Sequence, residues 1–217
     1  MSMNIFGDTG SLEIDAVNEG LCTEMHLTIY GGNISIQSGN DGINTNEDGV
    51  SVFAMNGGTL NITVTGETKE GDGIDSNGWL VINGGTVNTY ACAFSQDFGL
   101  DSDKGIYING GIVTASGNMM DEISDGAQPY TVFMCRETQA GGELYEIKDA
   151  EENVIMEVTP VNDFTVLVVS GEGITEDGNY SLWMDKTKIS EGMRGDMRPE
   201  GNMPEGMEPP KGREGMK

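Results

Sequence analysis

The chain has 217 residues, enough for one domain with a sizeable core or for two small domains. Asp and Glu number 36 against 11 Lys and Arg, so the formal net charge is −25, which excludes nucleic acid as a direct partner because two polyanions repel each other. The sequence has no apolar run of 18 residues and no signal-peptide pattern, so it predicts neither membrane insertion nor a leader.

Few of the usual catalytic and metal-binding side chains are present. The three cysteines, Cys22, Cys92 and Cys135, are odd in number and widely spaced, which argues against a disulfide framework and against a Cys-rich zinc site. His26 is the single histidine, so a site with several His ligands is excluded. We expect the imidazole to point outward and assign it no role. Any site chemistry must therefore rest mainly on oxygen-bearing side chains.

An internal repeat dominates the first part of the chain. Gly-Gly pairs occur at 31/32, 57/58, 84/85 and 110/111, and apolar residues alternate on both sides of each pair. Paired glycines among β-branched residues disfavour helix. The sequence predicts an all-β fold in which residues 1–125 form a right-handed parallel β-helix of about five coils, each stacked about 4.8 Å from the next.

The repeat also predicts which residues stack on one another. Three inward ladders of apolar side chains are expected, namely Leu27, Phe53, Leu80 and Ile106; Ile29, Met55, Ile82 and Ile108; and Ile34, Leu60, Val87 and Val113. The residues before three of the Gly-Gly pairs, Asn56, Asn83 and Asn109, are expected to hydrogen-bond along the coil axis.

After Asp125 the repeat stops and the strands become irregularly spaced. Five apolar segments predict an antiparallel β cap or subdomain over residues 126–190, namely Tyr130–Arg136, Glu143–Lys148, Val154–Thr159, Phe164–Ser170 and Tyr180–Met184. Residues 191–217 are rich in Gly, Met, Pro and Glu without apolar periodicity, and we expect this tail to be disordered.

A second repeated segment carries the acidic residues. It reads Gly-Ile-Asn-Thr-Asn at 42–46, Gly-Ile-Asp-Ser-Asn at 73–77 and Gly-Leu-Asp-Ser-Asp at 99–103. Stacking in register would place carboxylates about 5 Å apart, where they repel unless a cation lies between them. Oxygen ligands without His or Cys suit Ca²⁺. The candidate metal ligands are Asp41, Asn44, Asp72, Asp75, Asn77, Asp101 and Asp103. Asx turns would explain the same residues without a metal.

Aromatic residues expected to face outward provide candidate sugar contacts. Aromatic faces can cover a sugar ring while nearby Asn and Asp side chains bond its hydroxyls. The candidate carbohydrate-binding residues are Tyr30, Trp79, Tyr90 and Tyr107. Cys92 and Phe94 are expected to pack instead.

Residues 71–78 read Gly-Asp-Gly-Ile-Asp-Ser-Asn-Gly, and residues 80–87 read Leu-Val-Ile-Asn-Gly-Gly-Thr-Val. In these two alternating sequence motifs the chain resembles bacterial cell-surface carbohydrate-binding β-helix domains, which are similar in fold to pectate lyases. The segment from Gln139 to Gly142 and the strands after it look like the C-terminal β region of that family, so the resemblance covers most of residues 10–190.

The resemblance implies a right-handed parallel β-helix that carries calcium, is secreted or displayed on the cell surface, and binds plant-type or acidic polysaccharide without catalysis. The sequence departs from the family in lacking a visible signal peptide and in having fewer upstream coils.

Two alternatives stay open. A calcium-dependent polysaccharide lyase would need a basic side chain to abstract a proton, and Lys104 and then Lys69 are the candidates; paired carboxylates also keep a glycosidase open. A structural stalk or adhesin segment would use the acidic turns only for solubility. We favour non-catalytic polysaccharide binding.

Overall fold

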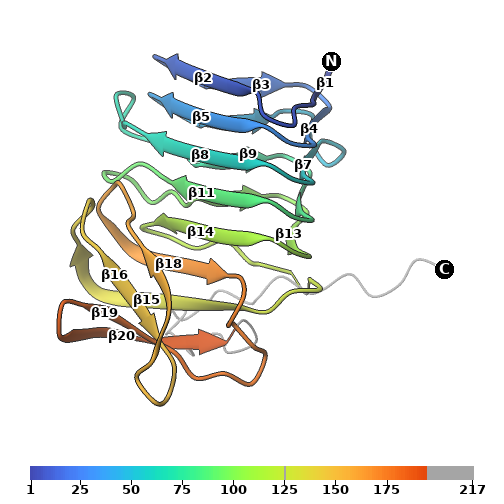
Figure 1. Cartoon of the computed structure of the whole chain (residues 1–217). Helices are drawn as coiled ribbons and strands as arrows, with labels where there is room; N and C mark the ends of the chain where they lie inside the picture. The colour runs from blue at the N-terminus through green and yellow to red at the C-terminus, as the bar shows by residue number, and fades with distance from the viewer. Residues whose placement is uncertain (125, 195–217) are drawn as a thin grey trace, which may run out of the picture.

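The computed structural model describes residues 1–124 and 126–194, which form twenty β-strands and no helix. Figure 1 shows short strands stacked in layers from the N-terminus, with a second group of strands against the far end of the stack. None of the described segments is a helix long and apolar enough to cross a membrane. The predicted all-β class is therefore confirmed.

Three parallel sheets form the walls of the β-helix. Sheet A consists of β1 (Ser2–Ile5), β4 (His26–Ile29), β7 (Val52–Met55), β10 (Trp79–Ile82) and β13 (Gly105–Ile108). Sheet B begins with β2 (Ser11–Ala16), β5 (Asn33–Ser38), β8 (Thr59–Val64), β11 (Thr86–Tyr90) and β14 (Ile112–Gly117). Sheet C consists of β3 (Leu21–Thr23), β6 (Ile43–Thr45), β9 (Ile74–Ser76) and β12 (Leu100–Ser102). The structure thus has four coils of three strands and the first two strands of a fifth.

The Gly-Gly pairs form the corner between sheets A and B. The second glycine of each pair has a positive φ, for example 84° at Gly58, a conformation that other residues rarely adopt. A Cβ on Gly58 would lie 2.5 Å from the carbonyl oxygen of Gly32 in the coil below, so the two backbones meet where only glycine fits. Absence of side chains at this corner lets successive coils stack in register.

The predicted ladders form the core. Leu27 pairs with Phe53, Phe53 with Leu80 and Leu80 with Ile106, and all four side chains are fully buried. Burial of each such side chain contributes roughly 1.5–3 kcal/mol. The asparagine ladder is also confirmed, because Asn83 and Asn109 each donate a hydrogen bond to the asparagine of the preceding coil.

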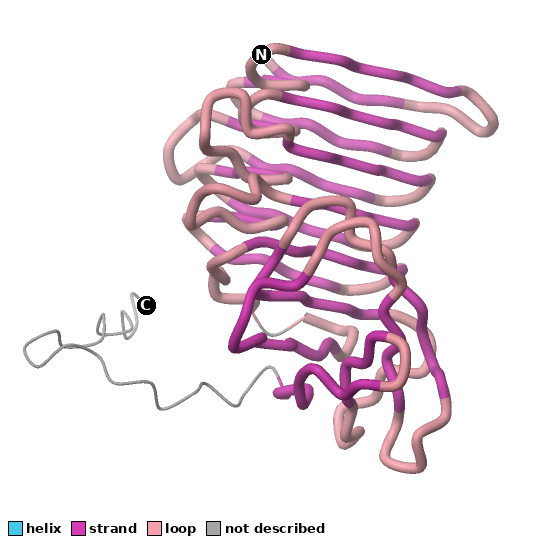
Figure 2. Tube along the Cα trace, turned by 90° about the vertical axis from the view of Figure 1, so that its left-hand side faces the viewer, coloured by secondary structure: helices cyan, strands magenta, loops and turns pink. Residues whose placement is uncertain are grey.

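An antiparallel cap continues sheet B, as Figures 1 and 2 show. Its strands are β15 (Tyr130–Gln139), β16 (Tyr145–Lys148), β17 (Val154–Val158), β18 (Phe164–Ser170), β19 (Ser181–Met184) and β20 (Thr187–Arg194). Strand β18 pairs antiparallel with β14, so it covers the edge that the last coil would otherwise leave open. A second hydrophobic cluster, centred on Phe133, Tyr145 and Phe164, fills the cap.

One strand differs from the sequence expectation. β20 continues to Arg194, whereas the sequence placed the start of a disordered tail at residue 191. The strand pairs with β15 and β19 even though it contains few apolar residues, so its partners and not its own pattern define it. The rest of the predicted tail, 195–217, lies outside the described residues.

Candidate functional site

An acidic face lies on the outer side of sheet C. Asn44 pairs with Asp75 and Asp75 pairs with Asp101, so the predicted column exists. Asn44 on β6 is only 8% exposed, while Asp75 and Asp101 are partly buried. The column therefore places two carboxylates and one amide at successive coil spacings, in a partly desolvated environment.

Two neighbouring aspartates have clear structural partners. Asp41 accepts hydrogen bonds from the Asp72 amide at 2.8 Å and from the Asn44 side chain at 3.0 Å. Asp72 accepts one from the Phe98 amide at 2.7 Å. Each carboxylate thus satisfies an N–H group of the next coil, a structural role that needs no metal. These bonds join separate coils and are not the local Asx turns that the sequence left open.

Asp75 and Asp101 differ from these two residues. Neither carboxylate accepts a hydrogen bond from any described residue, and the Oδ1 atom of Asn44 is also buried without a partner. An unpartnered buried amide oxygen costs free energy, and a carboxylate pair without donors costs more. The column therefore presents oxygen atoms that the fold itself does not use.

The pKa values of this face reflect the same environment. Burial, together with the charges of neighbouring aspartates, raises the pKa of Asp72 to about 8, of Asp75 to about 7 and of Asp101 to about 6. Burial likewise raises the pKa of Asp41. Either protons or a cation must offset this repulsion near neutral pH.

Two further carboxylates, which are not among the seven predicted ligands, lie beside the acidic face. Asp121, which follows β14, accepts a hydrogen bond from the Ser102 amide at 3.1 Å and adds to the repulsion at Asp101. Asp97 accepts one from the Gly71 amide at 2.6 Å. Asp97 lies two residues before the repeated segment 99–103 and belongs to the same coil, so the sequence itself places it near Asp101. Asp121 lies in a loop outside the repeat, so only the fold brings it to the acidic face.

Two predicted metal residues lie apart from the column. Asn77 follows β9 at the corner, where its amide donates to the Asn46 carbonyl and to Asp48. Asp103 is exposed at the equivalent place one coil later. The structure therefore divides the seven predicted residues into a face of five and a corner pair.

The residues of the face fit a cation in part. The described residues contain no group of three or more His, Cys, Asp or Glu side chains placed to hold a metal ion. Three side chains remain with oxygen atoms free for a hard cation, namely Asn44, Asp75 and Asp101. An amide oxygen with two carboxylates suits Ca²⁺, whose remaining ligands would be water.

The two candidate catalytic bases lie elsewhere. The Lys104 side chain extends over Gly49 at the corner between sheets C and A, where a Cβ on Gly49 would lie 3.6 Å from its Nζ atom. Lys69 is exposed in the turn between β8 and β9. Within the described part of the chain neither lysine makes an ion pair with a carboxylate.

Three of the four predicted aromatic residues lie on or beside sheet A. Trp79, 37% exposed, opens β10, and Tyr107 lies on the outer face of β13. Trp79 pairs with Gly105, two residues before Tyr107, and the Tyr107 ring occupies the space above Gly105. The two rings are therefore diagonal neighbours on one surface.

The fourth aromatic prediction is wrong. Tyr90 at the end of β11 is only 8% exposed, although alternation predicts an outward side chain. The loop between β17 and β18 covers this strand end, because Asn162 donates hydrogen bonds to the carbonyls of Tyr90 and Ala91. Beyond it, Cys92 is buried as expected, whereas Phe94 is 77% exposed, contrary to expectation.

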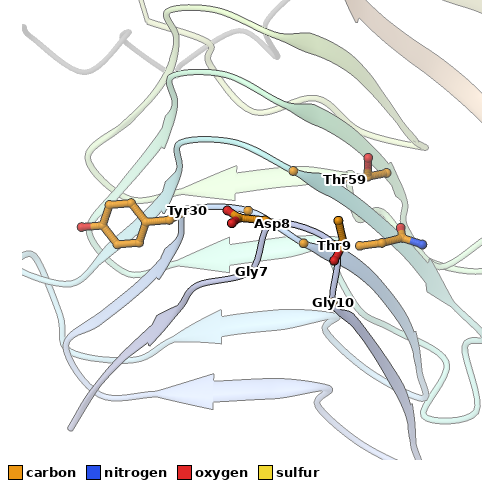
Figure 3. Close-up of a pocket in the computed structure, with 10 residues that line it drawn as sticks. Gly7, Asp8, Thr9, Gly10, Tyr30 and Thr59 are labelled. Atoms are coloured by element: carbon orange, nitrogen blue, oxygen red, sulfur yellow. The ribbon is translucent and has the colours of Figure 1, made fainter.

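Tyr30 borders a pocket at the corner of the first three coils (Figure 3). The pocket has a volume of about 470 Å³. Its lining combines glycine backbone with a few polar side chains and comprises Gly7, Asp8, Thr9, Gly10, Tyr30, Gly31, Gly32, Asn33, Gly58 and Thr59. The Tyr30 ring stacks on Phe6, with ring centroids 4.6 Å apart and ring planes within 4°.

Fold and surface together define a parallel β-helix with exposed aromatic rings and polar side chains on its walls. Residues 3–128, more than half of the chain, match a family described as carbohydrate-binding domain-containing proteins. The chain belongs to this family, and its partner is carbohydrate. No curated protein and no solved structure matches it.

Proposed function

We propose that the protein binds polysaccharide without catalysis, on the outer wall of a calcium-stabilised β-helix. One observation carries this proposal, namely the distribution of partly exposed aromatic rings along sheet A. Tyr30 belongs to the second coil, Trp79 to the fourth and Tyr107 to the fifth. Three coil spacings, about 14 Å, separate the first from the last, which favours a polymer over a single sugar ring.

The proposed calcium site is the column of Asn44, Asp75 and Asp101. Bound there, it would neutralise carboxylates that accept no hydrogen bond and would give the Asn44 oxygen a partner. A site with so few protein ligands should be weak, with a dissociation constant on the order of 10⁻⁴–10⁻³ M as in extracellular modules. This affinity suits the extracellular or bacterial cell-surface location that the family resemblance implies.

The positions of the two candidate bases, Lys104 and Lys69, favour binding over lyase chemistry. A lyase needs a basic group close to the metal that neutralises the uronate. Lys104 lies over Gly49 at a corner, and Lys69 lies in a solvent-exposed turn.

A polysaccharide panel tests the proposal. Two signals are measured, namely pull-down of the protein by each polymer and absorbance of unsaturated product. The polymers are pectin, polygalacturonate and cellulose, each in calcium and in chelator. We expect retention of at least one polymer and no product. Product formation would make the protein a lyase, and no retention of any polymer would refute polysaccharide binding.

A variant of the column tests the metal. Asp75→Asn removes one charge and no hydrogen bond, so the variant should melt at a higher temperature than the parent in chelator and gain less from calcium. Thermal melts at 0 and 10 times the calcium dissociation constant measure that gain, which is about 1.4 kcal/mol for a single site by linkage. Asp15→Asn, an exposed change on β2, is the matched control. Equal gains from calcium in all three proteins would contradict a metal at this column.

A further inference from the structure

A ridge of side chains runs along the corner between sheets A and B, parallel to the axis of the β-helix. It is formed by the residue that precedes the corner glycine in each coil. Ile5 pairs with Ile29, so Phe6 occupies in the first coil the place that Tyr30 occupies in the second. The ridge consists of Phe6, Tyr30, Asn56, Asn83 and Asn109. It therefore changes from two aromatic rings to three amides at the third coil.

The aromatic part of the ridge does not serve the core. Phe6 is 73% exposed and Tyr30 is 49% exposed, yet the two rings lie nearly parallel. Each ring covers one face of the other, and the outer faces and edges of the pair remain in solvent where the later coils carry polar amides. Such a surface is suited to the C–H face of a sugar ring, in the way that aromatic side chains cover other apolar ligand faces.

The hydrogen bonds of the three asparagines on the ridge all point the same way, from the later coil to the earlier one. Asn109 donates from Nδ2 to Oδ1 of Asn83, and Asn83 donates in the same way to Asn56, over 2.9 Å and 2.8 Å. Asn56 thus accepts a hydrogen bond, while its own Nδ2 group makes none to a described residue. The free donor end of the ladder lies in the coil next to Tyr30, where it can meet a ligand oxygen.

The pocket beside the ridge supplies further polar groups. Figure 3 shows Tyr30 and Thr59 at opposite sides of the pocket, with the Gly7–Gly10 loop between them. Asp8, Thr9 and Asn33 add a carboxylate, a hydroxyl and an amide to the lining, and no basic side chain belongs to it. Glycine backbone on the remaining wall leaves room for a ring to approach.

We propose that Phe6, Tyr30 and Asn56, with the adjoining pocket, form a subsite for a neutral sugar of the polysaccharide. This inference rests on the proposed function and adds the class of ligand. A uronate would meet the Asp8 carboxylate and the field of a chain with net charge −25, without a cation in the lining to offset them. A neutral pyranose packs against the exposed parts of the stacked ring pair, accepts a hydrogen bond from Asn56 Nδ2 and donates one from a hydroxyl to Asp8. Since the acidic column lies on sheet C, calcium is not required at this subsite.

Calorimetric titration in chelator tests the subsite. The ligands are soluble neutral polysaccharides, namely mixed-linkage β-glucan, galactomannan and xylan. Polygalacturonate is the acidic comparison. We expect at least one neutral polymer to bind and Tyr30→Ala and Phe6→Ala each to weaken its binding about tenfold, which is the loss of one aromatic contact. Asn56→Asp should weaken it similarly, because it removes the free donor and keeps the acceptor for Asn83.

Matched controls separate the ridge from general effects. Phe94→Ala removes an equally exposed ring from the loop between β11 and β12, and Asn18→Asp adds a charge beyond the far end of β2. Both should bind like the parent and melt within about 2 °C of it, since exposed changes rarely exceed about 0.5 kcal/mol.

Unchanged affinity in Tyr30→Ala and Asn56→Asp would overturn the subsite and leave polysaccharide binding in place. Calcium-free binding of polygalacturonate that Tyr30→Ala abolishes would overturn its neutrality. Failure of every polymer to bind the parent protein, in chelator and in calcium, would refute both the subsite and the proposed function.

Discussion

Gly58→Val is expected to lower the free energy of unfolding by at least about 3 kcal/mol, because two independent constraints act on this residue. Its φ of 84° is unfavourable for a β-branched residue, and an added Cβ would lie 2.5–2.8 Å from backbone atoms of Gly31 and Gly32. Backbone atoms within a stacked coil cannot move without shifting the register of the whole coil. The melting temperature should fall by roughly 6–12 °C, measured by circular dichroism.

Gly10→Ala is the matched control for this prediction. Gly10 is exposed, and an added Cβ would meet no atom within 4 Å. We expect its melting temperature to stay within about 2 °C of the parent value. Similar losses in the two variants would mean that the corner glycines do not limit how closely the coils stack.

The repeat allowed much of the fold to be predicted from the sequence. Gly-Gly pairs at nearly equal intervals fix the corner, and alternation around them assigns each neighbouring residue to the core or to solvent. Leu80 is therefore predictable from its position relative to Gly84 alone. In the cap, β20 was missed because it contains few apolar residues and because one of its two partners, β15, lies far earlier in the sequence.

The candidate site was predictable where the repeat extends and not beyond it. Asn44, Asp75 and Asp101 follow the register, so their column could be deduced. The burial of Tyr90 could not, because a cap loop more than 70 residues later covers it. Phe6 was missed although Phe6-Gly7 precedes Tyr30-Gly31 by 24 residues, a spacing close to the repeat, because only one glycine marks that corner.

Without calcium, the protein is expected to be less stable at pH 8 than at pH 5. Asp72, Asp75 and Asp101 have folded-state pKa values of about 8, 7 and 6, above the ordinary value of 3.8. Between pH 4 and pH 8 the folded chain therefore holds protons that the unfolded chain has released. Stability is highest where these groups stay protonated in the folded state, and it falls as the pH rises through their pKa values.

The expected loss from pH 5 to pH 8 is roughly 2–4 kcal/mol after allowance for solvent screening, or about 5–15 °C in melting temperature. Thermal melts in chelator across this range measure it. Asp75→Asn should reduce the slope by removing one of the three groups, and Asp15→Asn should not. Stability that rises from pH 5 to pH 8 in chelator would contradict the burial of this face.

Calcium should oppose this trend, because a cation binds only the ionised column. At pH 8 added calcium replaces the missing protons as the source of positive charge, whereas at pH 5 it must first displace them. The stabilisation by calcium is therefore expected to grow from pH 5 to pH 8. A gain that does not depend on pH would place the ion away from Asp75 and Asp101, since only the titrating column couples calcium to protons.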